Sequence, residues 1–233
     1  MPVDNSGRTV RAWDLPTRLF HWALVVLIIL APITNKMGSA TFYLHKVNGY
    51  LILSLVLYRI LWGFVGGTTA RFRTFVRPFA AFGYLGDLVR NRSRHFLGHN
   101  PLGGMMVLAL LAAAGGQALF GLMTLDDIPA TIEGPFASKV AKSTAEWVSV
   151  WHRRGFKIIL ALVALHVLAN LFYTFVKKDN LIRPMLTGVK PAGAYEDVAE
   201  NQPGSLARAA LCLALAIVVV FGSVWVFGSA PFR

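Results

Sequence analysis

Cysteine is nearly absent from this chain, and its scarcity excludes several kinds of site. The single cysteine, Cys212, lies inside an apolar run, so no intrachain disulfide can form. A Cys-x-x-Cys-His attachment for covalent haem and a thiolate cluster are excluded for the same reason. Any haem that this chain binds is therefore expected to be non-covalent and ligated by histidine.

Charged residues are also scarce, and acidic residues most of all. Asp and Glu total 11 against 23 Lys and Arg, 15% of the residues are charged and 55% are hydrophobic. With a mean hydropathy of +0.56, the composition is typical of an integral membrane protein. The net charge of +12 does not predict nucleic-acid binding, because the basic residues fall in short segments between apolar runs.

Five apolar stretches are each near or above the ~20 residues that a membrane-spanning helix needs. They cover residues 16–34, 45–65, 101–125, 147–176 and 206–228, with a polar linker at 191–205. We therefore predict an all-α integral membrane protein, with four transmembrane helices within residues 1–190 and an extra C-terminal one. A cleaved signal peptide is the alternative for the first stretch, and cleavage would remove His21. Four further spans and the aromatic-rich residues 13–22 favour a retained helix.

The distribution of Lys and Arg predicts the orientation of these spans. Thirteen basic residues lie before the first span, after the second and after the fourth, against four on the opposite side. The four are Lys36, Lys46, Lys139 and Lys142. Because basic loops stay in the cytoplasm, we expect a cytoplasmic N-terminus and, with five spans, an outer C-terminus.

Four histidines, His21, His45, His152 and His166, lie in or at the ends of the apolar stretches. His152 and His166 are 14 residues apart. On one helix this spacing returns both rings to within ~40° of one face, ~21 Å apart along the axis. Two imidazoles at different depths of a ~30 Å bilayer core are suited to hold two redox centres, one above the other.

The predicted topology pairs these histidines by depth. His45 and His152 both lie near the outer surface, whereas His21 and His166 lie closer to the cytoplasm. Each pair joins the fourth helix to a different helix, which is how two facing helices can hold a flat macrocycle from both axial sides. Arginines near the inner end of the second span, Arg59, Arg71, Arg73 and Arg77, could then pair with haem propionates.

Two other interpretations of the histidines stay open at this point. Each could be a polar residue satisfied by a neighbouring helix, as polar residues inside membranes usually are. They could also bind a metal ion without haem, but that requires three or four ligands at one depth, whereas these residues form two layers.

Several stretches of the chain resemble the bacterial cytochrome b561 family, which includes the haem b subunits that anchor Ni/Fe-hydrogenases and formate dehydrogenases. The stretches are WDLPTRLFHW (13–22), HKVNG (45–49), YRILWGF (58–64), LGHNPLG (97–103) and NLIRPMLTGVK (180–190), together with His152 and His166. The resemblance implies a four-helix bundle that holds two b haems. It assigns the axial ligands to His21, His45, His152 and His166, in the pairs that depth predicts.

The fifth span departs from this family pattern. It follows the linker and contains no histidine, so we assign it no redox role. Its small residues Gly222, Ser223 and Gly228 could pack against the core, a partner or a second copy of the chain, which would make a homodimer.

Together these observations predict electron transfer across the bacterial inner membrane. The partners would be membrane lipid, a quinone, and an outer-face redox protein such as a c-type cytochrome or a reductase or hydrogenase subunit. His99, Tyr84 and Asp87 are candidates for proton exchange with the quinone.

Whether the chain is also an enzyme in its own right stays open. It could oxidise superoxide and reduce ubiquinone, with Lys36, Lys46, Arg153 and Arg154 attracting the anion. A haem-free metal transporter or a passive membrane anchor is a third hypothesis.

Overall fold

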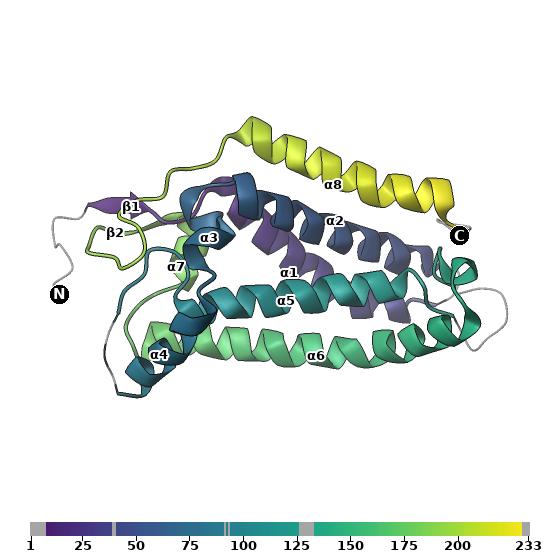
Figure 1. Cartoon of the computed structure of the whole chain (residues 1–233), viewed down its shortest axis with the longest axis horizontal. Helices are drawn as coiled ribbons and strands as arrows, with labels where there is room; N and C mark the ends of the chain where they lie inside the picture. The colour runs from purple at the N-terminus through teal and green to yellow at the C-terminus, as the bar shows by residue number, and fades with distance from the viewer. Residues whose placement is uncertain (1–7, 39–40, 91, 93, 126–132, 230–233) are drawn as a thin grey trace. The chain divides into compact units, whose positions relative to one another are not determined.

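Five long helices dominate the computed structural model, as predicted (Figure 1). The structure describes residues 8–38, 41–90, 92, 94–125 and 133–229, so the first seven residues of the predicted 1–190 region lie outside it. The long helices are α1 (Leu15–Lys36), α2 (Tyr43–Val65), α5 (Pro101–Gly121), α6 (Lys142–Phe175) and α8 (Leu206–Phe227). All five are long and apolar enough to cross a membrane.

Shorter elements occupy the connections between them. They are the strands β1 (Thr9–Arg11) and β2 (Val189–Pro191), the helices α3 (Phe72–Phe75), α4 (Pro78–Val89) and α7 (Ile182–Thr187), and the 3-10 turns η2 (Thr68–Ala70) and η3 (Ala137–Lys139). The span expected at 101–125 ends earlier, at Gly121. The span expected at 147–176 begins earlier, at Lys142, and continues unbroken for 34 residues.

Two helix starts follow from local sequence signals. The Asp14 carboxylate accepts a hydrogen bond from the backbone N–H of Thr17 at 2.9 Å, which caps α1. The Asn100 side chain accepts one from Gly103 N–H at 2.7 Å, and Pro101 occupies the first turn of α5. Each cap satisfies one of the N–H groups that a helix start leaves without an intrahelical partner.

The chain divides into two compact units. The first unit comprises residues 1–20, 59–109 and 162–210, and the second comprises residues 21–58, 110–161 and 211–233. Each of the five long helices contributes residues to both units.

In the second unit, α2, the turn that follows α5, and α8 share an apolar core. Tyr50, Leu122, Val220 and Val224 are buried together. The Tyr50 ring meets the Phe221 ring edge-on at 5.8 Å between centroids. The fifth helix, which no family feature predicts, is therefore an integral part of this unit's core.

In the first unit, connecting segments from distant parts of the sequence fold onto one another. Strand β1 pairs antiparallel with β2, with Val10 opposite Lys190, and Figure 1 shows the two strands side by side. Ala12, Trp13 and Leu97 form a buried cluster nearby. Residues 191–205, predicted as a plain linker, are anchored: the buried Asn201 side chain accepts a hydrogen bond from Thr69 N–H at 3.2 Å.

Candidate functional site

His45 is held in one orientation by the backbone of α1. Its Nδ1 lies 3.0 Å from the carbonyl oxygen of Ala31 and 3.4 Å from the hydroxyl of Thr34. A carbonyl oxygen can only accept a hydrogen bond, so Nδ1 carries the proton and donates it. The lone pair is then on Nε2, which is the nitrogen available to bind a metal.

His152 has the same arrangement on a different pair of helices. Its Nδ1 lies 2.9 Å from the carbonyl oxygen of Gln117 on α5. The side-chain amide of Gln117 donates back to the carbonyl oxygen of His152 at 2.7 Å, so one glutamine fixes both the ring and the turn that carries it. His152 is therefore also held with its Nε2 lone pair available.

The two rings face each other at a spacing that suits a shared metal. Their centroids are 6.2 Å apart and their planes are inclined by 80°. Two imidazoles that bind one metal ion from opposite sides, through metal–nitrogen bonds of about 2 Å, have ring centres roughly 6 Å apart. This spacing and the two oriented Nδ1–H groups are compatible with His45 and His152 as two ligands of one haem iron.

Small residues leave room around this pair. A Cβ added to Gly121 would lie 2.9 Å from Cε1 of His152, so only glycine permits the observed ring position. A Cβ added to Gly49, one turn beyond His45, would meet no atom of the described residues within 4 Å. Gly155 has a different role, because its added Cβ would lie 2.5 Å from Oε1 of Gln117. Gly155 therefore leaves room for the side chain of Gln117, which orients His152.

The other two histidines belong to different units. His21, in the second unit, lies in the second turn of α1 with its ring 5.0 Å from the Trp22 ring. His166, in the first unit, has Nε2 3.3 Å from the side-chain nitrogen of Asn170, which donates to the His166 carbonyl oxygen at 2.7 Å. Asn170 thus contacts both the ring and the backbone of this predicted ligand.

Three of the four arginines predicted to bind propionates, Arg59, Arg71 and Arg73, have distinct surroundings in the first unit. Arg59 is buried, with its guanidinium 5.2 Å from the Phe72 ring centroid and 5.7 Å from that of Phe75. Such contacts with aromatic faces offset part of the cost of a buried cation. Arg71 donates from Nε to the Gly66 carbonyl oxygen at 2.8 Å, and Arg73 is exposed.

The residues considered for proton exchange with a quinone do not form one group. His99 lies between the rings of Trp13 and Phe75, at 4.7 and 4.6 Å between centroids. The Tyr84 hydroxyl bonds to the Tyr173 hydroxyl at 2.8 Å. Asp87 pairs with Arg94 at 3.2 Å and Arg92 at 3.8 Å.

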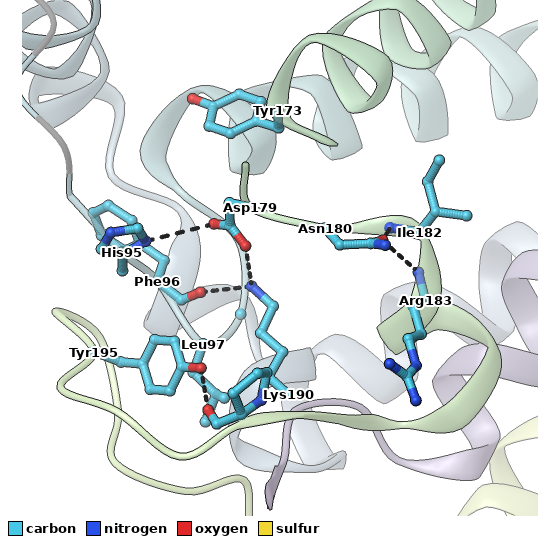
Figure 2. A network of polar contacts seen from close by, with 12 residues as sticks. His95, Phe96, Leu97, Tyr173, Asp179, Asn180, Ile182, Arg183, Lys190 and Tyr195 are labelled. Carbon is cyan, nitrogen blue, oxygen red and sulfur yellow. Dashed lines mark hydrogen bonds and ion pairs between the residues drawn. The ribbon is translucent and has the colours of Figure 1, made fainter. Parts of the chain in front are cut away.

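A polar network in the first unit centres on Lys190 (Figure 2). This buried amine donates to the Phe96 carbonyl oxygen at 2.9 Å and lies 3.9 Å from Asp179, which in turn lies 3.8 Å from Nδ1 of His95. Burial lowers the pKa of Lys190, and the carboxylates of Asp179 and Asp197 oppose that shift. The network holds His95 and Phe96 against the chain that follows α6.

Sequence reasoning missed the residues that orient the histidines. Gln117 gave a usable signal, because it is an uncharged polar side chain inside an otherwise apolar span. The carbonyl groups of Ala31 and Gln117 gave none, because any residue type supplies a backbone carbonyl. Across the described ranges, no group of three or more His, Cys, Asp or Glu side chains is placed to hold a metal ion.

Comparison with known proteins gives one consistent result. The family model described as "Prokaryotic cytochrome b561" matches residues 12–188, so α8 lies outside the matched region. A probable Ni/Fe-hydrogenase B-type cytochrome subunit of Rhizobium leguminosarum bv. viciae is 26% identical, covering 82% of this chain and 92% of its own length. A probable Ni/Fe-hydrogenase 1 B-type cytochrome subunit of Escherichia coli (strain K12) is 25% identical, covering 76% and 89%.

Proposed function

Because the chain belongs to the prokaryotic cytochrome b561 family, and is thus a b-type cytochrome for electron transfer in a membrane, we propose that it holds two haems. Each is ligated by two histidines. The observation that supports this most directly is the 6.2 Å spacing of the His45 and His152 rings, with both Nδ1–H groups donated to carbonyl oxygens. Haem b supplies one-electron redox chemistry when bound, and two axial histidines leave no open position on the iron for oxygen or substrate.

The second pair in this proposal is His21 with His166. The basis is the depth argument, which places His166 ~21 Å from His152 along α6. Both residues lie on long apolar helices, α1 and α6. We assign Arg59, Arg71 and Arg73 to the haem propionates of this pair, because a guanidinium binds a carboxylate with two parallel hydrogen bonds. Arg59 is the strongest of the three candidates, because its guanidinium is buried and contacts the rings of both Phe72 and Phe75.

The proposed partners are a redox subunit on the outer face and membrane quinone. The relatives' names identify them as Ni/Fe-hydrogenase cytochrome subunits, and a hydrogenase-type catalytic subunit is therefore our first candidate for this chain. A c-type cytochrome is the second candidate. The exposed face of α8, with Leu211, Val218 and Trp225, is open to a partner subunit, lipid or a second copy.

The haem stoichiometry tests the proposal. The protein purified in detergent should show b-type absorption bands on reduction, and a pyridine haemochrome assay should give two haems per chain. The exposed His95 is a matched control, because it interacts with Asp179 and belongs to neither pair. His95→Ala should keep both haems, whereas one haem per chain in the wild type contradicts the proposal.

Double variants test the pairing itself. His45→Ala and His152→Ala should each remove one haem, and the two changes combined should remove no more than one. His45→Ala combined with His166→Ala should remove both. If the first combination removes both haems instead, the two residues belong to different sites.

The proposed orientation places the N-terminus in the cytoplasm of a bacterium, with the protein in its inner membrane. Reporter fusions test this separately from haem binding. A phosphatase that is active only outside the cytoplasm should be active at the C-terminus and inactive at the N-terminus. The opposite pattern contradicts the orientation and leaves the haem ligation intact.

Superoxide oxidation with ubiquinone reduction is a second candidate. The observation in its favour is a set of cations in the second unit, which also holds the His45–His152 pair: Lys36, Lys46, Arg153 and Arg154. Stopped-flow reduction of the haem bands by superoxide, compared with reduction by a c-type cytochrome, separates the two. If Arg153→Gln and Arg154→Gln do not lower the rate of haem reduction by superoxide, this candidate is contradicted.

A further inference from the structure

Helix α4 exposes an apolar surface outside the five membrane-spanning helices. Phe79, Phe82 and Val89 are 89%, 77% and 81% exposed, while Ala81 and Tyr84 face inward and are buried. Large apolar side chains exposed to this extent along one short helix are unusual for a surface in contact with water. A helix with a buried side and an exposed apolar side is instead suited to the plane of a membrane interface.

The sequence around α4 is strongly basic. Three arginines precede the helix and three follow it, whereas Asp87 is the single acidic residue between them. The six are Arg71, Arg73, Arg77, Arg90, Arg92 and Arg94. Basic residues beside an apolar helix face attract anionic lipids to the membrane surface.

The C-terminal end of α4 borders a small, half-open hollow within the first unit. Its lining includes Arg92, Arg94 and Lys177, one carboxylate, Asp179, and the hydroxyl groups of Tyr84 and Tyr173. The hydrogen bond between these two tyrosines, 2.8 Å long, joins α4 to the last turns of α6. Burial raises the pKa of Tyr84, so its hydroxyl stays protonated at neutral pH.

We propose that the cations around the opening of this hollow bind the phosphate headgroup of an anionic phospholipid at the surface, while α4 lies in the interface with Phe79, Phe82 and Val89 among the acyl chains. The three cations outnumber the one carboxylate of the lining and match a phosphate, which accepts charge-assisted hydrogen bonds. The adjacent apolar face favours a phospholipid over free phosphate, because only the lipid also covers that face. The proposal needs a membrane-spanning chain but no particular haem pairing.

Asp87 limits the affinity of this site. Its carboxylate is mostly buried, at 14% exposure, and it pairs with Arg92 and Arg94, whose side chains are 70% and 49% exposed. The guanidinium groups therefore extend from Asp87 toward the surface. Because a carboxylate repels an anionic headgroup, removing its charge should strengthen binding while the arginines remain.

Native mass spectrometry of the full-length holoprotein in neutral detergent tests the headgroup site. Palmitoyl-oleoyl phosphatidylglycerol is the probe, and the matching phosphatidylcholine is the comparison lipid. Arg94→Gln and Lys177→Gln should each weaken phosphatidylglycerol binding about fivefold, the effect of one cation near a membrane surface. Asp87→Asn should strengthen it by a similar factor. Arg153→Gln, which removes an exposed cation of the second unit, should have no effect.

Three results would overturn the proposal. If Arg153→Gln weakens phosphatidylglycerol binding as much as Arg94→Gln does, the effect is one of overall charge. If Asp87→Asn weakens binding, the ion pairs of Asp87 only maintain the fold. Complete competition by inorganic phosphate, with no preference between the two lipids, would mean a site for a free anion. The haem spectrum of each variant is recorded in parallel, so a failure of this site is distinguishable from a failure of haem binding.

Spin labelling tests the placement of α4 by an independent measurement. In a Cys212→Ser background, a nitroxide at Phe82→Cys should be relaxed by oxygen and protected from a water-soluble nickel complex. A nitroxide at Arg90→Cys, at the basic end of the helix, should behave in the opposite way. Equal accessibility of both labels to the nickel complex would show that α4 lies in water.

Discussion

The two units differ in the polar contacts found inside each of them. In the second unit, the polar contacts that orient the histidines are neutral: ring nitrogens, an amide and backbone carbonyls. In the first unit, carboxylates and cations join segments that are far apart in the sequence, as in the contacts of Lys190 and Asp197. Neutral hydrogen bonds to backbone carbonyls suit the apolar part of a bilayer, whereas contacts between charged groups suit its polar boundary.

The difference follows from the cost of burying a charge. A carbonyl inside a membrane helix is already present and carries no net charge, so it can orient an imidazole at little cost. A carboxylate at that depth would have to be paired or neutralised. The connecting segments have no such restriction, and their charges form networks.

The largest expected effect is on the His45–His152 pair. Gly121→Val should displace the His152 ring, because even a Cβ would lie 2.9 Å from Cε1. Disturbing the surroundings of a metal ligand typically weakens metal binding 10- to 100-fold, so one of the two proposed haems should be lost on purification. Gly116→Val is the control, since a Cβ there meets no described atom within 4 Å. Loss of haem in both variants would show that helix packing, not ring position, is responsible.

A smaller effect is expected for the charged contact in the first unit. The Asp197 carboxylate accepts hydrogen bonds from Leu97 N–H at 2.7 Å and Gly98 N–H at 2.8 Å. Asp197→Ala should lower the free energy of unfolding by about 2–3 kcal/mol, because bonds to a charged group are the stronger kind. Thermal unfolding in detergent, followed by circular dichroism, measures this. Glu196→Ala, at the exposed neighbour, should change little.

The neutral contact in the second unit should matter less. The buried Asn48 amide donates to the Leu27 carbonyl oxygen at 3.0 Å and so joins α2 to α1. Asn48→Leu should cost about 1 kcal/mol, the usual range for a hydrogen bond between membrane helices. The same unfolding assay measures it. A cost above that of Asp197→Ala would reverse the order that the comparison predicts.

The smallest effect is a pH dependence in the first unit. Burial lowers the pKa of Lys190, so between that value and the ordinary lysine pKa near ~10.4 the unfolded chain binds more protons than the folded chain. Stability should therefore rise with pH through this window, and the penalty should be present in full below it. The difference in unfolding free energy between the wild type and Lys190→Met, measured at several alkaline pH values, isolates this residue. If the free energy of unfolding of the wild type, minus that of Lys190→Met, falls as the pH rises, the predicted direction is wrong.

The long helices could be predicted from the sequence, because about 20 apolar residues in succession have few other uses. The caps at Asp14 and Asn100 also followed from local signals. The placement of His152 and His166 on one helix followed from the length of the fourth apolar stretch. Depth also predicted that His45 and His152 lie near each other, and their ring centroids are 6.2 Å apart; their pairing on one haem stays a prediction.

Other features could not be predicted, because they depend on partners that the sequence does not identify. Helix α4 has its apolar residues on more than one side, which obscures the periodicity that indicates a surface helix. The pairing of β1 with β2 joins three-residue segments about 180 positions apart, too short for a strand pattern. The Asp197 contacts connect a loop to a loop, for which no spacing rule exists.

The pairing of β1 with β2 has a consequence for biogenesis. Residues 9–11 are made early, but their partners, residues 189–191, are made only after the fourth long helix is complete. During synthesis, the N-terminal strand must therefore wait until α1, α2, α5 and α6 have left the ribosome. Closure of this short sheet marks the point at which the first unit can finish folding.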